Sequence, residues 1–146
     1  MTLTIRSVAQ DDYAQWHRLW TAYLEFYDST LPEETKEIAF SRLLAQDTKV
    51  HGKIAVSDGE AVGLVHFIYH DHMWHPEGVC YLQDLYADPA KRGIGIGRKL
   101  IESVYDAATA AGVPSVYWMT QDFNQTARQL YDRIGTVTPF IKYQRK

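Results

Sequence analysis

The chain has 146 residues, of which 46% are hydrophobic and 23% are charged, and its formal net charge is -3. This length and composition predict one globular domain with a single core and exclude a largely disordered chain. The negative charge argues against nucleic-acid binding, although it leaves room for an acidic site that attracts a cation. Cys80 is the single cysteine, so we expect neither an intrachain disulfide nor a cysteine-based zinc site.

The chain carries no sign of a membrane or targeting segment. Its first residues, Met1–Arg6, lack an apolar targeting stretch, and no run approaches the roughly 18 apolar residues that a membrane span needs. We therefore expect a cytoplasmic protein with no membrane or nucleic-acid partner. Because no repeat, linker or low-complexity segment divides it, residues 1–146 are expected to form one domain.

Hydrophobic periodicity predicts the elements of the first half of the chain. Alternation over Thr2–Val8 predicts a strand, and aromatic residues at helical spacing from Trp16 to Tyr27 predict a helix. A second helix is expected from Pro32 onward, followed by strands over 50–56 and 61–69 that the hairpin signal Asp58-Gly59 joins. Residues 70–78 are polar and rich in turn formers, and they predict a loop.

The second half of the chain predicts alternating strands and helices. We expect strands over 79–87, 113–120 and 136–143, a helix from Gly95 to Ala111, and a short helix over Asn124–Ile134. Three strands joined by hairpins and followed by a strand–helix–strand crossover predict an α/β domain. Its mixed, mostly antiparallel central sheet should carry helices on both faces.

A glycine-rich turn, Arg92-Gly-Ile-Gly-Ile-Gly-Arg98, joins the fourth predicted strand to the long helix. Glycines leave backbone amides unshielded, and a helix start adds unpaired N–H groups, so the pattern indicates a phosphate or pyrophosphate site. The dinucleotide fingerprint would need a third glycine at Arg98 or Leu100, and a P-loop would need a hydroxyl residue after Lys99. Both nucleotide motifs are therefore excluded, and a flexible turn with a helix cap is the alternative.

The turn resembles the signature (Q/R)-x-x-G-x-(G/A) of the GCN5-related N-acetyltransferase (GNAT) superfamily. In that family the loop holds the pyrophosphate of acetyl-coenzyme A (acetyl-CoA). The preceding segment, Leu82–Pro89, resembles the splayed fourth strand of the family, whose free backbone groups pair with the pantetheine arm. The order of the predicted elements is also similar to that of the family from Thr2 to the C-terminus. The resemblance implies a GNAT fold and acetyl-CoA as the cofactor.

A second segment, Asn124–Gly135, is similar to the family motif N-x-x-A-x-x-(F/L)-Y-x-x-x-G. Helical spacing alone would make Tyr131 a core aromatic residue, whereas the resemblance makes it the acid that protonates the departing thiolate. It also implies that Asn124 hydrogen-bonds the pantetheine arm and that Ala127 leaves space for this arm. The two motifs together imply these acetyl-CoA-binding residues: Leu85, Tyr86, Ala87, Arg92, Gly93, Ile94, Gly95, Ile96, Gly97, Arg98, Asn124, Ala127 and Tyr131.

The base that deprotonates the acceptor amine is the open question. Many relatives place a glutamate where this chain has Gln83, which cannot accept a proton at neutral pH. Asp84 is the catalytic candidate, although strand alternation would point it to the opposite face unless a bulge intervenes, and a structural role is equally consistent. A water chain through Asp84, Glu25 or a loop histidine is a further alternative. The resemblance implies direct transfer in a ternary complex, which needs no protein nucleophile.

The acceptor site is expected at the end of the first helix. Aromatic rings beside a carboxylate suit a cationic amine, whereas most of Trp16, Leu19, Trp20 and Tyr23 are expected in the core. The histidines between 70 and 75 fit no common closed metal motif, so no metal site is expected, and Trp74 is instead placed at the acceptor entrance. The candidate acceptor-binding residues are Phe26, Tyr27, Asp28, Trp74, Gln83 and Asp84.

Further segments are similar to the fungal histone and polyamine acetyltransferase subgroup of the family, some members of which act on D-amino acids. These segments are residues 16–27, 84–86, 114–118 and 141–146. They imply an amine N-acetyltransferase for small polyamines or amino acids, with protein lysines as an alternative. They also imply a homodimer or a dimer of dimers with the C-terminal strand near the interface. Two competing hypotheses are a non-catalytic acyl-CoA sensor, suggested by Gln83, and a more distant nucleotide-dependent oxidoreductase.

Overall fold

A five-stranded sheet of order β1-β2-β3-β4-β5 forms the centre of the computed structural model, which describes residues 2–46, 48–91 and 93–146. Strands β1 to β4 pair antiparallel, and β5 runs parallel to β4. The strands are β1 (Leu3–Ser7), β2 (Val50–Ser57), β3 (Glu60–His72), β4 (His75–Ala87) and β5 (Val116–Tyr117). The predicted mixed, mostly antiparallel sheet is confirmed.

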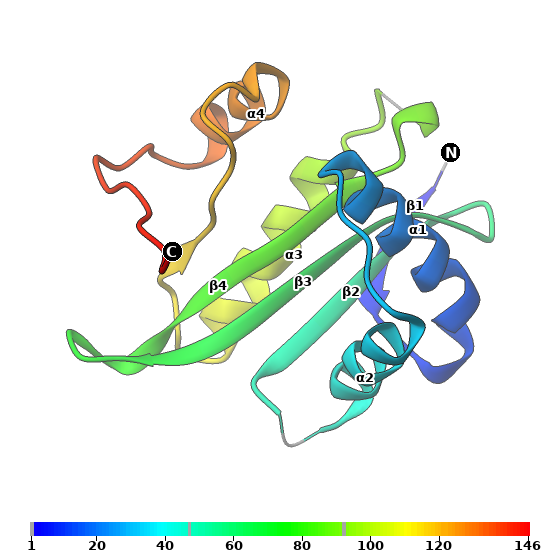
Figure 1. Cartoon of the computed structure of the whole chain (residues 1–146), viewed down its shortest axis with the longest axis horizontal. Coiled ribbons are helices and arrows are strands. Elements are labelled where there is room, and N and C mark those ends of the chain that lie inside the picture. The colour runs from blue at the N-terminus through cyan, green and yellow to red at the C-terminus, as the bar shows by residue number, and fades with distance from the viewer. Residues whose placement is uncertain (1, 47, 92) are drawn as a thin grey trace.

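Helices cover both faces of this sheet, as the sequence predicts. Helices α1 (Tyr13–Phe26) and α2 (Glu33–Leu44) lie on one face, and α3 (Ile96–Ala110) lies on the other (Figure 1). Helix α4 (Gln125–Ile134) follows β5 and stands at one side of the sheet (Figure 1). Two short 3-10 helices, η1 (Gln10–Asp12) and η2 (Pro89–Lys91), precede α1 and follow β4.

The structure corrects two of the sequence-based predictions. Residues 70–78 do not form a loop, because β3 and β4 continue through them as a hairpin in which His72 pairs with His75. Polar residues are common in such a ribbon because both of its faces meet water. Residues 136–143 do not form a strand. A strand needs a neighbour for its backbone hydrogen bonds, and this segment has no such neighbour in the described part of the chain.

Each face of the sheet has its own hydrophobic cluster. The α3 cluster contains the buried residues Ala55, Val62, Val65, Phe67, Cys80, Leu82, Ile96, Leu100, Ile101, Val104 and Ala108. The cluster under α1 and α2 contains Val8, Trp16, Leu19, Trp20, Phe40, Ile54, Ala61 and Leu64. The expectation that most of the α1 aromatic stripe lies in the core is therefore confirmed for Trp16 and Trp20, which are 0% and 8% exposed.

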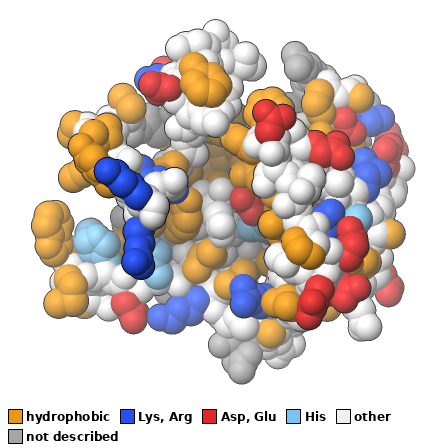
Figure 2. Space-filling model, in the orientation of Figure 1, with side chains coloured by type: hydrophobic (Ala, Val, Ile, Leu, Met, Phe, Trp, Pro, Cys, Tyr) orange, Lys and Arg blue, Asp and Glu red, His pale blue; other side chains and the backbone are white. Residues whose placement is uncertain are grey.

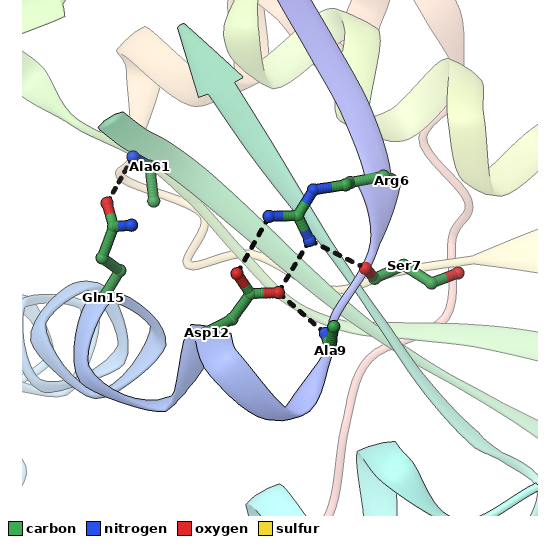
Figure 3. Close-up of polar contacts among 6 residues, drawn as sticks. All are labelled: Arg6, Ser7, Ala9, Asp12, Gln15 and Ala61. Atoms are coloured by element: carbon green, nitrogen blue, oxygen red, sulfur yellow. Dashed lines mark hydrogen bonds and ion pairs between the residues drawn. The ribbon is translucent and has the colours of Figure 1, made fainter. Parts of the chain in front are cut away.

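Polar contacts fix the start of α1 against the sheet (Figure 3). Arg6 on β1 donates two hydrogen bonds to the carboxylate of Asp12, at 2.7 and 2.9 Å, and the N–H of Ala9 donates to the same carboxylate at 2.7 Å. One turn further, the side chain of Gln15 accepts the N–H of Ala61 at 2.7 Å. The hydrogen bonds from Arg6 lower the pKa of Asp12. These contacts position α1, which carries several candidate site residues.

We expect Arg6→Met to lower the free energy of unfolding by about 1–3 kcal/mol at pH 7, because it leaves a buried carboxylate without its charged donor. The ion pair stabilises the fold only while Asp12 is ionised. The loss should therefore shrink as the pH falls below about 4 and through the lowered pKa of Asp12. Urea unfolding at pH 7 and pH 3 measures both effects.

The control for this prediction is Glu102→Gln, which breaks the exposed pair between Arg98 and Glu102. Exposed pairs of this kind contribute little, so the control should lose less than about 0.5 kcal/mol. Equal losses in the two variants would contradict a special role for the Arg6–Asp12 contact.

Candidate active site

Strands β4 and β5 separate after a short pairing. They pair only at Cys80 with Val116 and at Tyr81 with Tyr117, whereas β4 continues its ladder with β3 as far as Ala87. Beyond Tyr81, alternate residues of β4 therefore direct their N–H and C=O groups into a gap rather than to another described strand. Figure 2 shows a hollow here, with apolar side chains along it, between the part of the molecule that carries α4 and the part that carries α1.

A β-bulge at Gln83 changes the direction of the side chains along β4. His66 of β3 pairs with Asp84 but Phe67 pairs with Leu82, so Gln83 is the extra residue. Leu82 consequently packs in the cluster under α3, while Asp84 contacts α1 on the opposite face. Gln83 itself is exposed. The sequence argument from strict alternation therefore does not apply to Asp84, because a bulge does intervene.

A pocket opens beside this bulge, where α1, β4 and α4 approach one another. Its lining residues are Tyr23, Tyr27, Leu82, Gln83, Leu85, Trp118, Met119 and Tyr131. The structure thus brings together four of the residues singled out from the sequence: Tyr27, Gln83, Leu85 and Tyr131. Sequence reasoning missed Trp118 and Met119 and left Tyr23 in the core. No local pattern marks these three as pocket residues, because their position depends on how α1 and the chain after β5 pack.

Tyr131 projects from α4 into the pocket. Its ring packs edge-on against Trp118, with ring centroids 5.6 Å apart, and the Tyr105 hydroxyl holds the end of α4 by donating to the carbonyl of Ile134 at 2.7 Å. Burial, with a smaller contribution from Tyr27, raises the pKa of Tyr131 to about 12. The Tyr131 hydroxyl therefore keeps its proton at neutral pH and can act as a hydrogen-bond donor in the pocket.

Asp84 lies in a buried polar cluster next to the pocket, and it is 9% exposed. Its Oδ2 accepts the indole N–H of Trp20 at 3.3 Å and lies 2.8 Å from Nδ1 of His66. On the other side of the imidazole, Nε2 accepts the indole N–H of Trp16 at 2.9 Å. Because an indole nitrogen can only donate, the geometry places the His66 proton on Nδ1, from which it is donated to Asp84.

The end of α1 lies at the edge of the pocket. Tyr27 lines the pocket and is 38% exposed, and Phe26 packs edge-on against it with ring centroids 5.1 Å apart. Asp28 follows with a positive φ of 53° and does not line the pocket. Trp74 is not brought to the pocket of its own chain. It lies at the tip of the β3–β4 hairpin, separated from Gln83 by an extended strand of roughly 25–30 Å.

The glycine-rich turn leads directly into α3. Gly93 and Gly95 have φ angles of 88° and 73°, which favour glycine, and Gly95 is the residue before the first helical turn. Among the described residues, no side chain caps this helix at Gly95, and the first N–H groups of a helix, here those of residues 96–98, have no acceptor within it. The turn therefore presents main-chain donors and the positive end of the helix dipole to an anion.

The side chains of the turn contribute less than its backbone. Ile96 is 4% exposed and belongs to the core, so only its main chain can face a ligand, while Arg98 donates to Glu102 at 3.2 Å. Ile94 is half-buried against the same core cluster. Arg92, which the sequence also assigns to the cofactor, lies outside the described residues.

Gly63 on β3 is a further site residue that the sequence reasoning missed. A Cβ atom at Gly63 would lie 2.7 Å from Cγ2 of Ile96 and 2.9 Å from the carbonyl oxygen of Tyr86. The missing side chain lets the first turn of α3 sit directly on β3 and beside β4. A glycine within an apolar strand is the sequence signal for such a close approach.

Asn124 and Cys80 both make contacts that support the fold. Asn124 caps α4, since its Oδ1 accepts the N–H of Ala127 at 3.4 Å and its Nδ2 donates to Thr120 at 3.4 Å. Cys80 is fully buried, and burial raises the pKa of its thiol to about 11. Cys80 is thus a free, buried residue of β4.

The described part of the chain contains no group of three or more His, Cys, Asp or Glu side chains placed to hold a metal ion. His72 and His75 face each other across the hairpin with ring centroids 4.9 Å apart, but they form a pair only. None of the helices within residues 2–46, 48–91 and 93–146 combines the length and apolar character that crossing a bilayer requires.

Residues 14–136 match the model of the acetyltransferase (GNAT) family. The chain is 34% identical over 145 residues to the D-amino-acid N-acetyltransferase HPA3 of Saccharomyces cerevisiae, a match that covers 98% of this chain and 90% of the relative. It is 33% identical over 96 residues to the thialysine N-epsilon-acetyltransferase of Sus scrofa, covering 66% of this chain and 55% of that relative. A solved structure of AAC(6')-Iy with the bisubstrate analog CoA-S-monomethyl-acetylneamine superposes with a TM-score of 0.88 at 20% identity, covering 100% of this chain and 99% of that chain.

The chain therefore belongs to the GNAT family of acetyltransferases, and the fold inferred from the sequence is confirmed. It is an N-acetyltransferase that transfers an acetyl group to an amine and uses acetyl-CoA. The uncapped start of α3 and the gap between β4 and β5 fit such a ligand, because they offer donors for its phosphates and free backbone groups for its amide-containing arm. Neither a non-catalytic sensor nor an oxidoreductase is supported.

Proposed function

We propose that this chain acetylates the primary amine of an amino acid or a small polyamine by direct transfer within a ternary complex. The observation that carries the proposal is the pocket in which Tyr131, Gln83 and the aromatic end of α1 meet beside the gap between β4 and β5. HPA3 acts on D-amino acids by name, and the relative from Sus scrofa acts on thialysine. Both names favour an amino-acid acceptor over a protein lysine.

Acetyl-CoA supplies a thioester carbon that the amine nitrogen attacks. We assign its pyrophosphate to the glycine-rich turn. The described residues that offer main-chain N–H groups there, or border them, are Gly93, Ile94, Gly95, Ile96, Gly97 and Arg98. Its pantetheine arm is assigned to the open side of β4 over Leu85, Tyr86 and Ala87 and to the start of α4 at Asn124 and Ala127. The half-buried position of Ala127 and the exposed turn before α3 support this path.

At the reacting end, Tyr131 donates a hydrogen bond and then its proton to the departing sulfur. Its raised pKa ensures that the hydroxyl is protonated before each turnover at neutral pH. A backbone N–H of Leu85 or Tyr86 stabilises the oxygen on which negative charge develops. The acceptor enters along Tyr27, with Phe26 and Asp28 at the entrance and the Gln83 amide in the pocket wall. Aromatic rings and the carboxylate of Asp84 attract an ammonium group.

A thiol-release assay tests this function directly. With acetyl-CoA present, we expect turnover on D- or L-amino acids, thialysine, spermidine or spermine, and slower turnover on a basic peptide. Tyr131→Phe should lower kcat about 100-fold, because the leaving sulfur loses its proton donor, while CoA affinity measured by calorimetry stays unchanged. A protein that binds CoA but releases no thiol with any amine would overturn the proposal.

The assignment of the pyrophosphate predicts that Gly95→Ala weakens CoA binding about tenfold or more, because it distorts the turn that aims the N–H groups. Gly112→Ala is the matched control. Both glycines have positive φ angles, 73° and 76°, and open space where a Cβ would lie. Each variant should therefore lose about 1–2 kcal/mol of stability from backbone strain, and only the first should lose affinity. Equal CoA affinities in a calorimetric titration would contradict the assignment.

We also propose that two copies of the chain associate through the segment 136–146. Its apolar side chains meet water in the single chain, since Val137, Phe140, Ile141 and Tyr143 are 71%, 83%, 78% and 89% exposed. The neighbouring edge strand β5 is only two residues long. A second copy would supply cover for these side chains and strand partners for the segment. Only another subunit could bring Trp74 to an acceptor entrance.

Ile141→Asp should shift the protein to a monomer of 16.8 kDa in sedimentation equilibrium, because a charge replaces an apolar contact of the proposed interface. Ile38→Asp is the matched control, since Ile38 lies on α2 and is 47% exposed. The mass of the wild-type protein distinguishes a dimer from a dimer of dimers. A wild-type chain that sediments as a monomer would refute the proposal.

A further inference from the structure

An acceptor amine reaches the pocket mostly as an ammonium ion, because primary amines are protonated at neutral pH. It must lose a proton before its nitrogen can attack the thioester. Gln83, which lies in the pocket wall, cannot accept that proton. Glu25, the other carboxylate considered from the sequence, is exposed and does not line the pocket. The reaction therefore needs a route from the pocket to a different acceptor of the proton.

Tyr23 provides that route, because it belongs to both the pocket and the buried cluster. Its side chain lines the pocket together with Gln83 and Tyr131. It also lies one helical turn after Trp20, whose indole N–H donates to the carboxylate of Asp84 at 3.3 Å, and burial together with this nearby carboxylate raises the pKa of Tyr23. We propose that Tyr23 contacts the acceptor amine and relays its proton to Asp84. This inference rests on the proposed function and adds a catalytic residue to it.

The proton balance of the step is simple. One N–H bond of the ammonium breaks as its proton binds the Tyr23 oxygen, and the O–H bond of Tyr23 breaks as its own proton binds a carboxylate oxygen of Asp84. The products are a neutral amine with a free electron pair, an unchanged tyrosine and a carboxylic acid. No electrons are exchanged. In a desolvated pocket, converting an ammonium and a carboxylate into two neutral groups costs less than it does in water.

The cluster around Asp84 directs the proton to the carboxylate rather than to the imidazole. Nε2 of His66 is occupied by the indole N–H of Trp16 at 2.9 Å, so its lone pair is already used. Nδ1 carries the imidazole proton, which is donated to Asp84 at 2.8 Å. His66 could take up a further proton only by losing the hydrogen bond from Trp16. Because both ring nitrogens of His66 are engaged, the carboxylate of Asp84 is the group in this cluster that remains available to accept the proton.

The tyrosines around Tyr23 stay neutral between pH 7 and 9, so enzyme kinetics in this pH range can test the relay. The titratable side chains that face it are Asp84 and Tyr81 of β4, Tyr27 of α1 and Tyr131 of α4. Burial raises the pKa of Tyr27 and of Tyr81, and that of Tyr131 to about 12, so none of these tyrosines changes charge between pH 7 and 9. The pKa of Tyr23 is also raised by burial and by Asp84, so Tyr23 rests as a neutral hydroxyl.

The test compares pH profiles of kcat/KM for one acceptor amine in wild-type protein and in Tyr23→Phe. With the relay, the ammonium form reacts, and kcat/KM changes little between pH 7 and 9. Without it, only the neutral amine reacts, so kcat/KM should fall about 100-fold at pH 7 and rise about tenfold per pH unit. An acceptor whose amine pKa is about 8, near that of a peptide α-amino group, should rescue most of the loss.

Matched variants separate a relay from a structural effect. Tyr13→Phe removes a hydroxyl from the same helix at a position outside the pocket, and it should keep the wild-type profile. Asp84→Asn should reproduce the profile of Tyr23→Phe, and the double variant should be no slower than either single variant, because the two residues act in one step. CoA affinity should be unchanged in Tyr23→Phe, and a thermal melt checks that it is folded.

The outcomes are distinguishable. A Tyr23→Phe protein with the flat profile of the wild type would overturn the relay while leaving the acetyltransferase proposal intact. A Tyr13→Phe protein whose kcat/KM rises steeply with pH would also overturn the relay and leave the acetyltransferase proposal intact. If Tyr23→Phe fails to fold, a flat profile in Asp84→Asn overturns the relay and a steep one supports it. A wild-type protein that acetylates no amine in this assay would overturn both the proposed function and the relay.

Discussion

The β-bulge at Gln83 is the feature on which the arrangement of the site depends. In a regular strand without this bulge, Leu82 and Asp84 would point to the same face, and Asp84 would enter the apolar cluster under α3. A carboxylate there would be buried without donors, at a cost of several kcal/mol. The bulge instead sends Asp84 to the α1 face, where Trp20 and His66 donate to it, and leaves Gln83 at the pocket.

The same stretch of β4 also lies between the part of the site assigned to acetyl-CoA and the part assigned to the acceptor amine. At the edge of β4 beyond its short pairing with β5, the free backbone groups of β4 face the gap between these two strands. Helix α3 lies close by, because Gly63 has no side chain that would keep it away. On the face toward α1, it carries the buried carboxylate and the aromatic rings. One irregular strand thus separates the groups suited to a phosphate-bearing donor from those suited to a cation. This stretch of β4 pairs with β3 and packs against both hydrophobic clusters.

The sequence predicts the parts of this fold that depend on local pattern. Periodicity and turn residues located the helices, the hairpin at Asp58-Gly59 and the glycine-rich turn, because each is specified within a few neighbouring residues. The errors concern long-range pairing. The hairpin across 70–78 and the missing strand at 136–143 depend on whether a partner strand is present, which residue type does not encode. The bulge and the pocket position of Tyr23 depend likewise on the register of β3 and on the docking of α1.

The ordered polar cluster explains how a pocket lined by a glutamine can serve a reaction that releases a proton. A carboxylate exposed in the pocket would be hydrated and would compete with the acceptor for space. In the proposed relay, the carboxylate lies behind Tyr23, so that its charge attracts a cation while the neutral hydroxyl of Tyr23 meets the substrate. The indole of Trp20 and the imidazole of His66 then replace water that the carboxylate has lost, and the indole of Trp16 fixes the orientation of that imidazole. Trp16 and Trp20 of α1 therefore pack against the sheet with their rings and also hold the polar cluster with their N–H groups, Trp20 by donating to Asp84 and Trp16 by donating to His66.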